Sequence, residues 1–254
     1  MITLIATREL KSLLRSPLAW AALCAISAIQ AWLFLIHLEQ YDTYRSQLLA
    51  LTNPPGVTEL VFTPLFAASG LLMMMVLPLI TMRSFAEQQR DQTLVLLTSA
   101  PVALPAIVVG KFAGLYLFTL LLNLPLLAMP LSLTGAVDLD WGLLGANMLA
   151  LGLLCGAFVA VGLWASSLTR HPAAAVMISF ALLLGLWLLE SAAGGNGAQA
   201  QAALLPTLST LTHFRALLSG WVGSGNLIYF LLLTALPLGL TILRLQSQRL
   251  TGAS

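Results

Sequence analysis

The stretch RSFAEQQRDQTLVLLTSAPV, residues 83–102, decides how this chain can fold, because it is a polar interruption between two long apolar runs. The run FAASGLLMMMVLPLITM (66–82) precedes it, and the run LPAIVVGKFAGLYLFTLLL (104–122) follows it. The stretch holds four of the chain's twenty Lys, Arg, Asp and Glu residues and has no Gly or Pro before Pro101. It predicts a polar, helix-compatible segment between two helices long enough to cross a membrane.

The composition of the whole chain indicates a membrane protein. Of its 254 residues, 59% are hydrophobic and only 8% are charged, with a mean hydropathy of +0.95. A soluble domain carries about 25% charged residues, so this chain lacks the polar surface that a soluble globule needs. The net charge of +2, without any basic run, argues against a nucleic-acid partner. Cys24 and Cys155 lie in apolar runs and are expected to be buried thiols rather than a disulfide.

Six segments are apolar and long enough to span a bilayer, which needs about 20 residues. The first follows a basic N-terminal segment that carries Glu9, and it is interpreted as an uncleaved span rather than a signal peptide. No repeat or linker divides the chain, so we expect one all-α transmembrane domain over residues 1–254. The predicted spans are Pro17–Leu38, Val61–Met82, Pro105–Leu133, Leu143–Leu168, Pro172–Glu190 and Asn226–Leu243.

The distribution of Lys and Arg predicts the orientation, because cytoplasmic segments carry the excess of these residues. With the N-terminus in the cytoplasm, the outer loops hold only Arg45 and Arg215. Both termini and the stretch 83–102 are then cytoplasmic. The cytoplasmic side holds Arg8, Lys11, Arg15, Arg83, Arg90, Lys111, Arg170, Arg244 and Arg249.

The residues of the stretch alone leave two interpretations open. Arg83, Glu87 and Arg90 have the spacing that places side chains on one helix face, where they can form a local ion pair. Phe85 and the pair Leu94 and Leu97 supply apolar patches. The segment is either an amphipathic helix lying on the lipid headgroups or a docking helix that pushes on a cytoplasmic partner.

The sequence of residues 78–112 resembles the cytoplasmic segment of type-2 ATP-binding-cassette (ABC) permeases. It reads PLITMRSFAEQQRDQTLVLLTSAPVALPAIVVGKF. In that family an Arg-x-x-Ala-Glu-Glu run leads to Gly-Thr-x-Glu, then Leu-Leu, a Ser/Thr-Pro turn and a Gly-Lys. Gln92 and Val95 depart from the family's Gly and Glu, so the contact is expected to be less polar. The matching residues are Met82, Arg83, Ala86, Glu87, Thr93, Leu94, Leu96, Leu97, Pro101, Gly110 and Lys111.

Two later regions extend the resemblance to about residues 60–245. The region DLDWGLLGANMLALGLLCGAFVAVGLWASSLTRHPAAA (138–175) looks like the family's Asp-Trp-Gly start and Ser-Leu-Thr-Arg end of span 4. The region LTHFRALLSGWVGSGNLIYFLLL (211–233) looks like its His-Phe…Gly…Tyr-Phe approach to the last span. Together the three regions resemble the gliding-motility-like subfamily.

The resemblance implies a fold and a mechanism. The fold would be an ABC type-2 exporter-like transmembrane domain with a cytoplasmic coupling helix between spans 2 and 3, in a bacterial inner membrane. Two permease subunits would pair, as a homo- or heterodimer, above separate ATPase subunits that bind ATP and Mg²⁺. Their task would be export or extracytoplasmic mechanical work. The residues that would carry the ATPase contact are Arg83, Phe85, Glu87, Arg90, Thr93, Leu94 and Leu97.

The sequence contains no nucleotide-binding loop of its own, since that motif needs Gly, four residues and then Gly-Lys-Ser/Thr. At the only Gly-Lys, Gly110-Lys111, Pro105 and Phe112 occupy the first and last motif positions. The chain is therefore expected to bind no cofactor and to be no enzyme, with ATP hydrolysis on a partner chain. Lys111 is interpreted as an anchor that reaches the cytoplasmic edge of span 3.

Other function classes have weaker support in the sequence. A metalloprotease motif His-Glu-x-x-His is absent, and no metal-ligand spacing occurs. A nucleophilic Ser69 would need a nearby base, but His37, His171 and His213 all lie near predicted span ends. A secondary transporter usually carries an ionisable residue inside the membrane, and the middles of the predicted spans hold none. Asn123 and Asn147 are expected to bond across helices. An ATP-independent secondary transporter or a membrane scaffold remains the alternative.

Small residues and the outer loops complete the expectations. Ser69-Gly70 and a set of glycines offer faces for close helix packing, and Met73 to Met75 are expected to pack against lipid or helices. The outer loop 39–60 is expected to begin as a helix, and 194–225 to hold interfacial helices next to span 6. These loops are either the docking site of an auxiliary extracytoplasmic protein or a solvated cap. No residue identifies a substrate. The glycines are Gly110, Gly114, Gly142, Gly145, Gly152 and Gly156.

Overall fold

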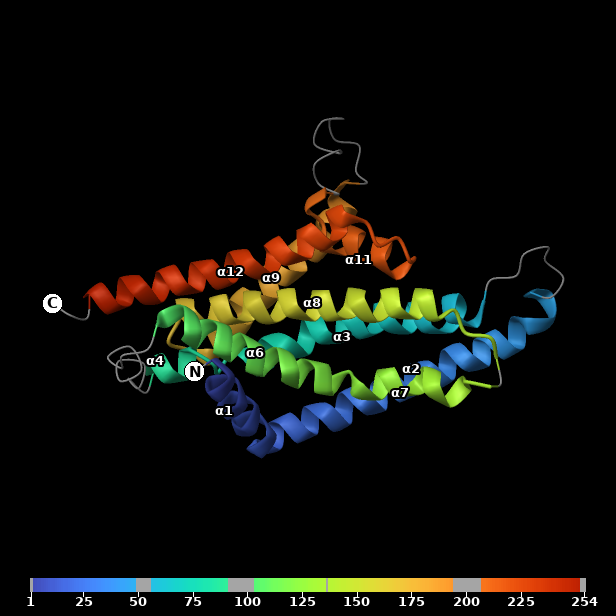
Figure 1. Cartoon of the computed structure of the whole chain (residues 1–254), viewed down its shortest axis with the longest axis horizontal. Coiled ribbons are helices and arrows are strands. Elements are labelled where there is room, and N and C mark those ends of the chain that lie inside the picture. Colours follow the sequence, from blue (N-terminus) through green and yellow to red (C-terminus); the bar gives the residue numbers. More distant parts are fainter. Residues whose placement is uncertain (1, 49–55, 91–102, 136, 194–206, 252–254) are drawn as a thin grey trace.

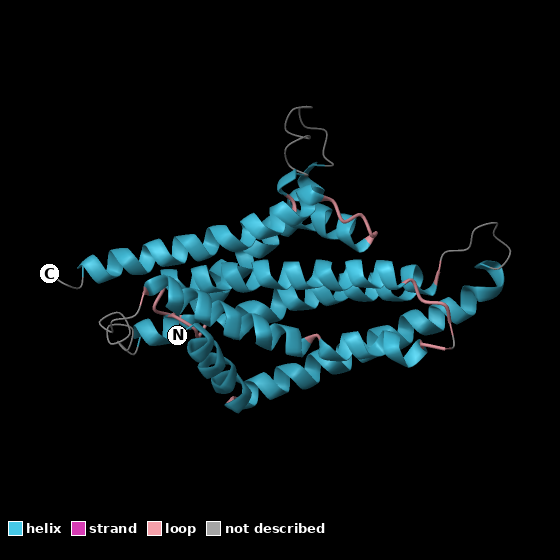
Figure 2. Cartoon of the chain, viewed as in Figure 1, coloured by secondary structure: helices cyan, strands magenta, loops and turns pink. Residues whose placement is uncertain are grey.

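The computed structural model describes residues 2–48, 56–90, 103–135, 137–193 and 207–251, and their regular structure is helical (Figures 1 and 2). Within these described residues, six helices are long and apolar enough to cross a membrane, with mean hydropathies of 1.9 to 2.2. All six predicted spans are thereby confirmed as apolar helices of spanning length. The chain is an all-α multi-pass membrane protein.

The six spans are built from seven helices and one π-helical turn. The second span begins with the π-helical turn Thr58–Phe62, and the third consists of two consecutive helices. Several helices extend beyond the predicted spans: α2, for example, continues to Leu48 and so includes the helix expected at the start of the first outer loop. The helices are α2 (Pro17–Leu48), α3 (Thr63–Thr81), α6 (Leu104–Leu122), α7 (Leu124–Leu133), α8 (Trp141–Leu168), α9 (Pro172–Ala193) and α12 (Ser224–Thr251).

The fourth span, α8, is the centre of the bundle. Buried residues make up 72% of its most apolar window, against 17% for each of α2, α9 and α12. It packs against α3, α6, α9 and α12 (Figure 1). The helices around α8 therefore present apolar side chains outward to lipid, while α8 itself supplies most of the interior contacts.

The helices alternate in direction, so one end of the bundle collects both ends of the chain. The start of α1 (Ile2–Arg15), the end of α12 and the short helix α4 (Ala86–Arg90) lie at this end, and the α7–α8 connection lies at the other (Figure 1). Eight of the nine basic residues predicted to be cytoplasmic are exposed, and Lys111 is the exception. The assignment of this end to the cytoplasm stays a prediction.

The N-terminal segment is a separate helix, α1, which the sequence analysis treated only as the basic flank of the first span. Pro17 disfavours helical backbone at Ser16, so α1 ends at Arg15 and α2 starts at Pro17. Trp20 Nε1 donates to the carbonyl oxygen of Leu14 at 2.7 Å and holds the elbow between the two helices. The helical spacing of apolar residues between the charged residues of 2–15 is the sequence feature that could have predicted this helix.

The third span is broken at Asn123, where the sequence analysis expected one continuous helix. Pro125 has no backbone N–H to donate. The side chain of Asn123 also forms a local hydrogen bond at the break, because its Nδ2 donates to the carbonyl oxygen of Thr119 at 2.9 Å. The Asn123 residue has φ −94° and ψ 1°, outside the helical range, so α7 starts on a new axis at Leu124.

Two further expectations have a clear outcome in the described residues. The loop before span 6 contains α11 (Thr210–Leu218), whose Phe214 is wholly buried; residues 194–206 lie outside the described part of the chain. Cys155 is buried as expected, but Cys24 is exposed on α2, so the prediction of two buried thiols was wrong for Cys24. The lipid-facing position of α2 explains that exposure.

Candidate functional site

The predicted contact residues of the stretch 83–102 fall into four groups. Arg83 and Arg90 are exposed, and Phe85 is wholly buried. The Glu87 backbone is helical in α4, but its side chain lies outside the described atoms, and so does its predicted ion pair. The residues Thr93, Leu94 and Leu97 lie in 91–102, which is outside the described part of the chain.

Two details of the predicted helix need correction. A turn over residues 82–85 separates α3 from α4, so Arg83 does not share a continuous helix with Arg90. Phe85 faces the interior, where Lys111 Nζ lies 5.0 Å from its ring centroid. Phe85 therefore stabilises this part of the bundle from inside and does not belong to an exposed contact surface.

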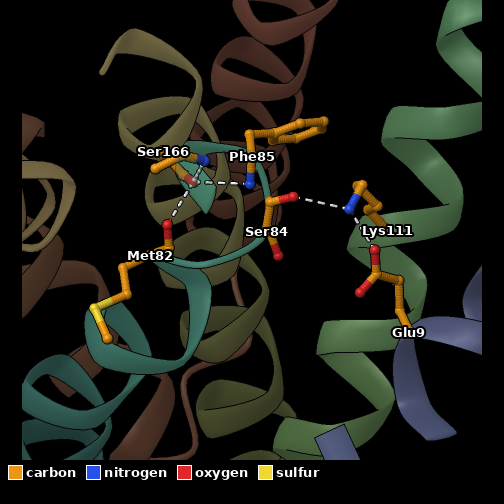
Figure 3. A network of polar contacts seen from close by, with 7 residues as sticks. Glu9, Met82, Ser84, Phe85, Lys111 and Ser166 are labelled. Carbon is orange, nitrogen blue, oxygen red and sulfur yellow. Dashed lines mark hydrogen bonds and ion pairs between the residues drawn. The ribbon is translucent and has the colours of Figure 1, made fainter. Parts of the chain in front are cut away.

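Ser166 of α8 fastens the turn between α3 and α4 (Figure 3). Its hydroxyl oxygen accepts hydrogen bonds from the backbone N–H groups of Phe85 and Ala86, each at 3.0 Å, and donates to the carbonyl oxygen of Met82 at 2.9 Å. The first N–H groups of a helix have no partner within the helix. A side chain from another span satisfies two of them here, so the hydroxyl of Ser166 caps the start of α4 and holds the turn against α8.

A second set of contacts joins the same region to α8. Gln89 Nε2 of α4 donates to the carbonyl oxygen of Ser167 at 2.9 Å. The last residue of α3 also packs closely against α8. A Cβ placed on Gly162 of α8 would lie 2.2 Å from Oγ1 of Thr81. The end of α3, the turn and α4 are thus held against α8 by hydrogen bonds and by close packing. We call residues 81–90, with their partners on α8, α6 and α1, the α3–α4 joint.

Lys111 connects the joint to α6 and α1 (Figure 3). Its side chain is 3% exposed, forms an ion pair with Glu9 of α1, and donates to the carbonyl oxygen of Ser84 at 2.9 Å. The side-chain amide of Gln88 satisfies its neighbours when its Nε2 donates to the carbonyl oxygen of Ser84. In this orientation its Oε1 accepts a hydrogen bond from Lys111 Nζ at 3.1 Å. Lys111 is therefore not the snorkelling anchor that the sequence suggested; it is a buried charge paired inside the bundle.

Two glycines of α6 bring α1 close enough for this ion pair. A Cβ on Gly110 would lie 2.8 Å from Cβ of Ile5, and one on Gly114 would lie 2.7 Å from the carbonyl oxygen of Ala6. The predicted close-packing role of Gly110 and Gly114 is confirmed, although their partner is α1 and not another span. By contrast, a Cβ on Gly145 would meet nothing within 4 Å.

A separate polar cluster lies in the middle of the bundle. Gln30 Nε2 of α2 donates to Asn123 Oδ1 at 3.3 Å and to Ser69 Oγ at 3.5 Å. Asn147 Nδ2 of α8 donates to Thr63 Oγ1 of the second span at 3.2 Å. The prediction that both asparagines bond across helices is confirmed, but Gln30 was missed, although it is a single amide in an apolar span. Ser69, raised as a nucleophile, is wholly buried and accepts from an amide.

The contacts of Ser166 give a direct prediction. Replacing Ser166 with Ala leaves the N–H groups of Phe85 and Ala86 without their acceptor, and we expect the free energy of unfolding to fall by about 2 kcal/mol. Hydrogen–deuterium exchange should become faster in the peptide that covers residues 82–90. Ser167→Ala is the matched control, because that hydroxyl donates only to the carbonyl oxygen of Trp164 in its own helix. Equal exchange in the two variants would contradict the role of Ser166.

The comparison with known proteins adds no family assignment. No protein-family model matches this chain, and no curated protein matches it.

Proposed function

We propose that this chain is the transmembrane permease subunit of an ATP-driven ABC transporter of the type-2 class. It pairs with a second permease subunit in a bacterial inner membrane and works with separate ATPase subunits, which bind ATP and Mg²⁺. Its task is export or an extracytoplasmic mechanical role. The outer loops and α11 are the surface that an auxiliary extracytoplasmic protein would contact.

The observation that carries the proposal is the attachment of α4 to several helices at once. The backbone joins α4 to α3, Ser166 and Ser167 join it to α8, and Ser84 joins the preceding turn to Lys111 of α6. A push on α4 from a soluble partner would thus reach three spans and α1. Packed helices that have two arrangements pass on such a displacement as rigid bodies.

The exposed side chains of the joint are suited to a polar partner. Arg83 and Arg90 are both exposed at the end where the basic residues gather. Within this proposal Phe85 has a supporting role, because it is buried beneath the turn and does not reach a partner. Glu87, Thr93, Leu94 and Leu97 stay predicted contacts.

The test is purification of the tagged chain from native membranes in a mild detergent, followed by mass spectrometry. We expect an ATPase with a phosphate-binding loop to come along in stoichiometric amount. The double substitution Glu87→Arg and Leu94→Arg should leave membrane insertion intact and abolish both this association and ATP-dependent activity. Arg244→Glu is the control, because Arg244 is exposed at the same end but lies on α12.

Two results would count against the proposal. One is the absence of any ATPase, even after cross-linking through residues 83–102. The other is an unchanged rate of ATP hydrolysis in the double variant. Either result would return attention to an ATP-independent secondary transporter or a scaffold.

One observation favours the secondary transporter as the second candidate. Lys111 lies within the third span and forms its ion pair with Glu9 inside the bundle, and ionisable residues within spans often mark ion pathways. Purified chain in vesicles without any ATPase would then conduct protons or Na⁺. The double variant Glu9→Gln with Lys111→Met would abolish that flux. We expect no flux in either protein if the ATP-driven function is correct.

A further inference from the structure

A cavity of about 320 Å³ lies beside the α3–α4 joint, between the elbow of α1 and α2 and the end of α3. Its volume is at the lower end of the range for pockets that hold small ligands. The elbow is held by the hydrogen bond from Trp20 to Leu14 and by the packing of α1 on Gly110 and Gly114. The cavity is therefore part of the folded bundle and does not depend on a ligand for its shape.

One side of the cavity is polar and carries a positive charge. Arg83 lines it, is exposed, and has no ion-pair partner among the described side chains. The carboxylate of Glu9 also lines it, but Lys111 neutralises this charge. Ser84 lines the same side and is only 7% exposed. The guanidinium of Arg83 suits an anion with several acceptor oxygens.

Apolar residues of two spanning helices also line the cavity. Leu18 of α2 and Leu79 of α3 line it and are 44% and 47% exposed. Both belong to helices that form spans, so their exposed surfaces face acyl chains once the chain is in a bilayer. A free phosphate ion would use the polar side alone. A molecule with an anionic head and an apolar tail would use both sides.

We infer that this cavity binds the headgroup of an anionic phospholipid, with the phosphodiester at Arg83 and Ser84 and an acyl chain along Leu18 and Leu79. Basic pockets between spans at the cytoplasmic side bind such headgroups. Arg8, Lys11 and Arg15 of α1 do not line the cavity, but they are exposed and favour an anionic leaflet. This inference requires a membrane protein but does not depend on the proposed transport function.

The test measures lipid binding to the purified full chain. The delipidated protein in dodecyl maltoside is titrated with dioleoyl phosphatidylglycerol or dioleoyl phosphatidylcholine, and native mass spectrometry counts the bound lipids. We expect preferential retention of phosphatidylglycerol. Arg83→Gln should weaken its binding roughly tenfold through loss of a charge-assisted contact, and Arg83→Lys should recover part of it. Ser12→Trp, which fills the cavity from α1, should abolish it.

Arg90→Gln is the matched control, because Arg90 is an exposed arginine of the same joint that does not line the cavity. It should bind phosphatidylglycerol as the unaltered chain does. Equal retention of the two lipids, or equal affinity in Arg83→Gln and Arg90→Gln, would overturn the inference. Displacement of phosphatidylglycerol by millimolar inorganic phosphate alone would also overturn it, by showing a site for a soluble anion.

Discussion

Replacing Glu9 with Gln is expected to lower the free energy of unfolding by about 3 kcal/mol, because it leaves Lys111 charged and buried without its counter-ion. The Lys111 side chain is 3% exposed, against 21% for that of Glu9. Hydration therefore cannot replace the lost carboxylate at Lys111. The carbonyl oxygen of Ser84 remains as an acceptor, which keeps the expected cost at the lower end for a broken buried pair.

A double variant separates the charge effect from packing. Glu9→Gln combined with Lys111→Met removes both charges and keeps a long apolar side chain in the bundle, so we expect most of the stability to return. Cys155 provides the readout, because it is buried and its thiol becomes reactive only on unfolding. A Cys24→Ser background removes the exposed thiol. A double variant less stable than Glu9→Gln alone would contradict this account.

Replacing Gly162 with Ala is expected to lower the free energy of unfolding by about 3 kcal/mol, the upper end for an added methyl group in a packed interior. The new Cβ would lie 2.2 Å from Oγ1 and 2.8 Å from Cβ of Thr81. Thr81 cannot turn away freely, because its hydroxyl bonds to the carbonyl oxygen of Leu77 at 2.9 Å. Relief therefore requires α3 to move away from α8 at Thr81, the first residue of the joint.

Gly145→Ala on the same helix is the control for that substitution. Among the described residues, no other part of the chain comes within 4 Å of the Cβ that it would add, so helix propensity is the main change, and we expect stability to be unchanged or up to about 1 kcal/mol higher. The same thiol-labelling measurement compares the two variants. Equal stability of Gly162→Ala and Gly145→Ala would show that the α3–α8 contact is looser than the structure indicates.

Two independent observations concern the same segment. The order of residues in 78–112 resembles a permease family, and tertiary contacts hold residues 81–90 against α8, α6 and α1. Ser166 and Lys111 matter to the joint for their hydrogen bonds with α4 and its preceding turn. Substituting either residue would test how the end of α3 can move, whether the chain is a permease subunit or a secondary transporter.

The sequence by itself determined the class and the number of spans. Runs of apolar residues near 20 in length have few stable alternatives to a spanning helix. For the same reason the polar stretch 83–102 is predicted to lie outside the bilayer. The residues around Gly110-Lys111, 105–112, do not fit the nucleotide-binding motif. These properties depend on composition along the chain and not on which helix meets which.

Only the tertiary structure decided which polar residues meet. Glu9 and Lys111 are far apart in the sequence, and their ion pair forms because Gly110 and Gly114 admit α1 against α6. The polar sequence around Phe85 predicted a surface position, yet Phe85 is buried. Its backbone N–H donates a hydrogen bond to Ser166 of α8, which holds it inside the bundle. Helix periodicity predicts which residues share a face, but the partner of that face depends on close packing between distant segments.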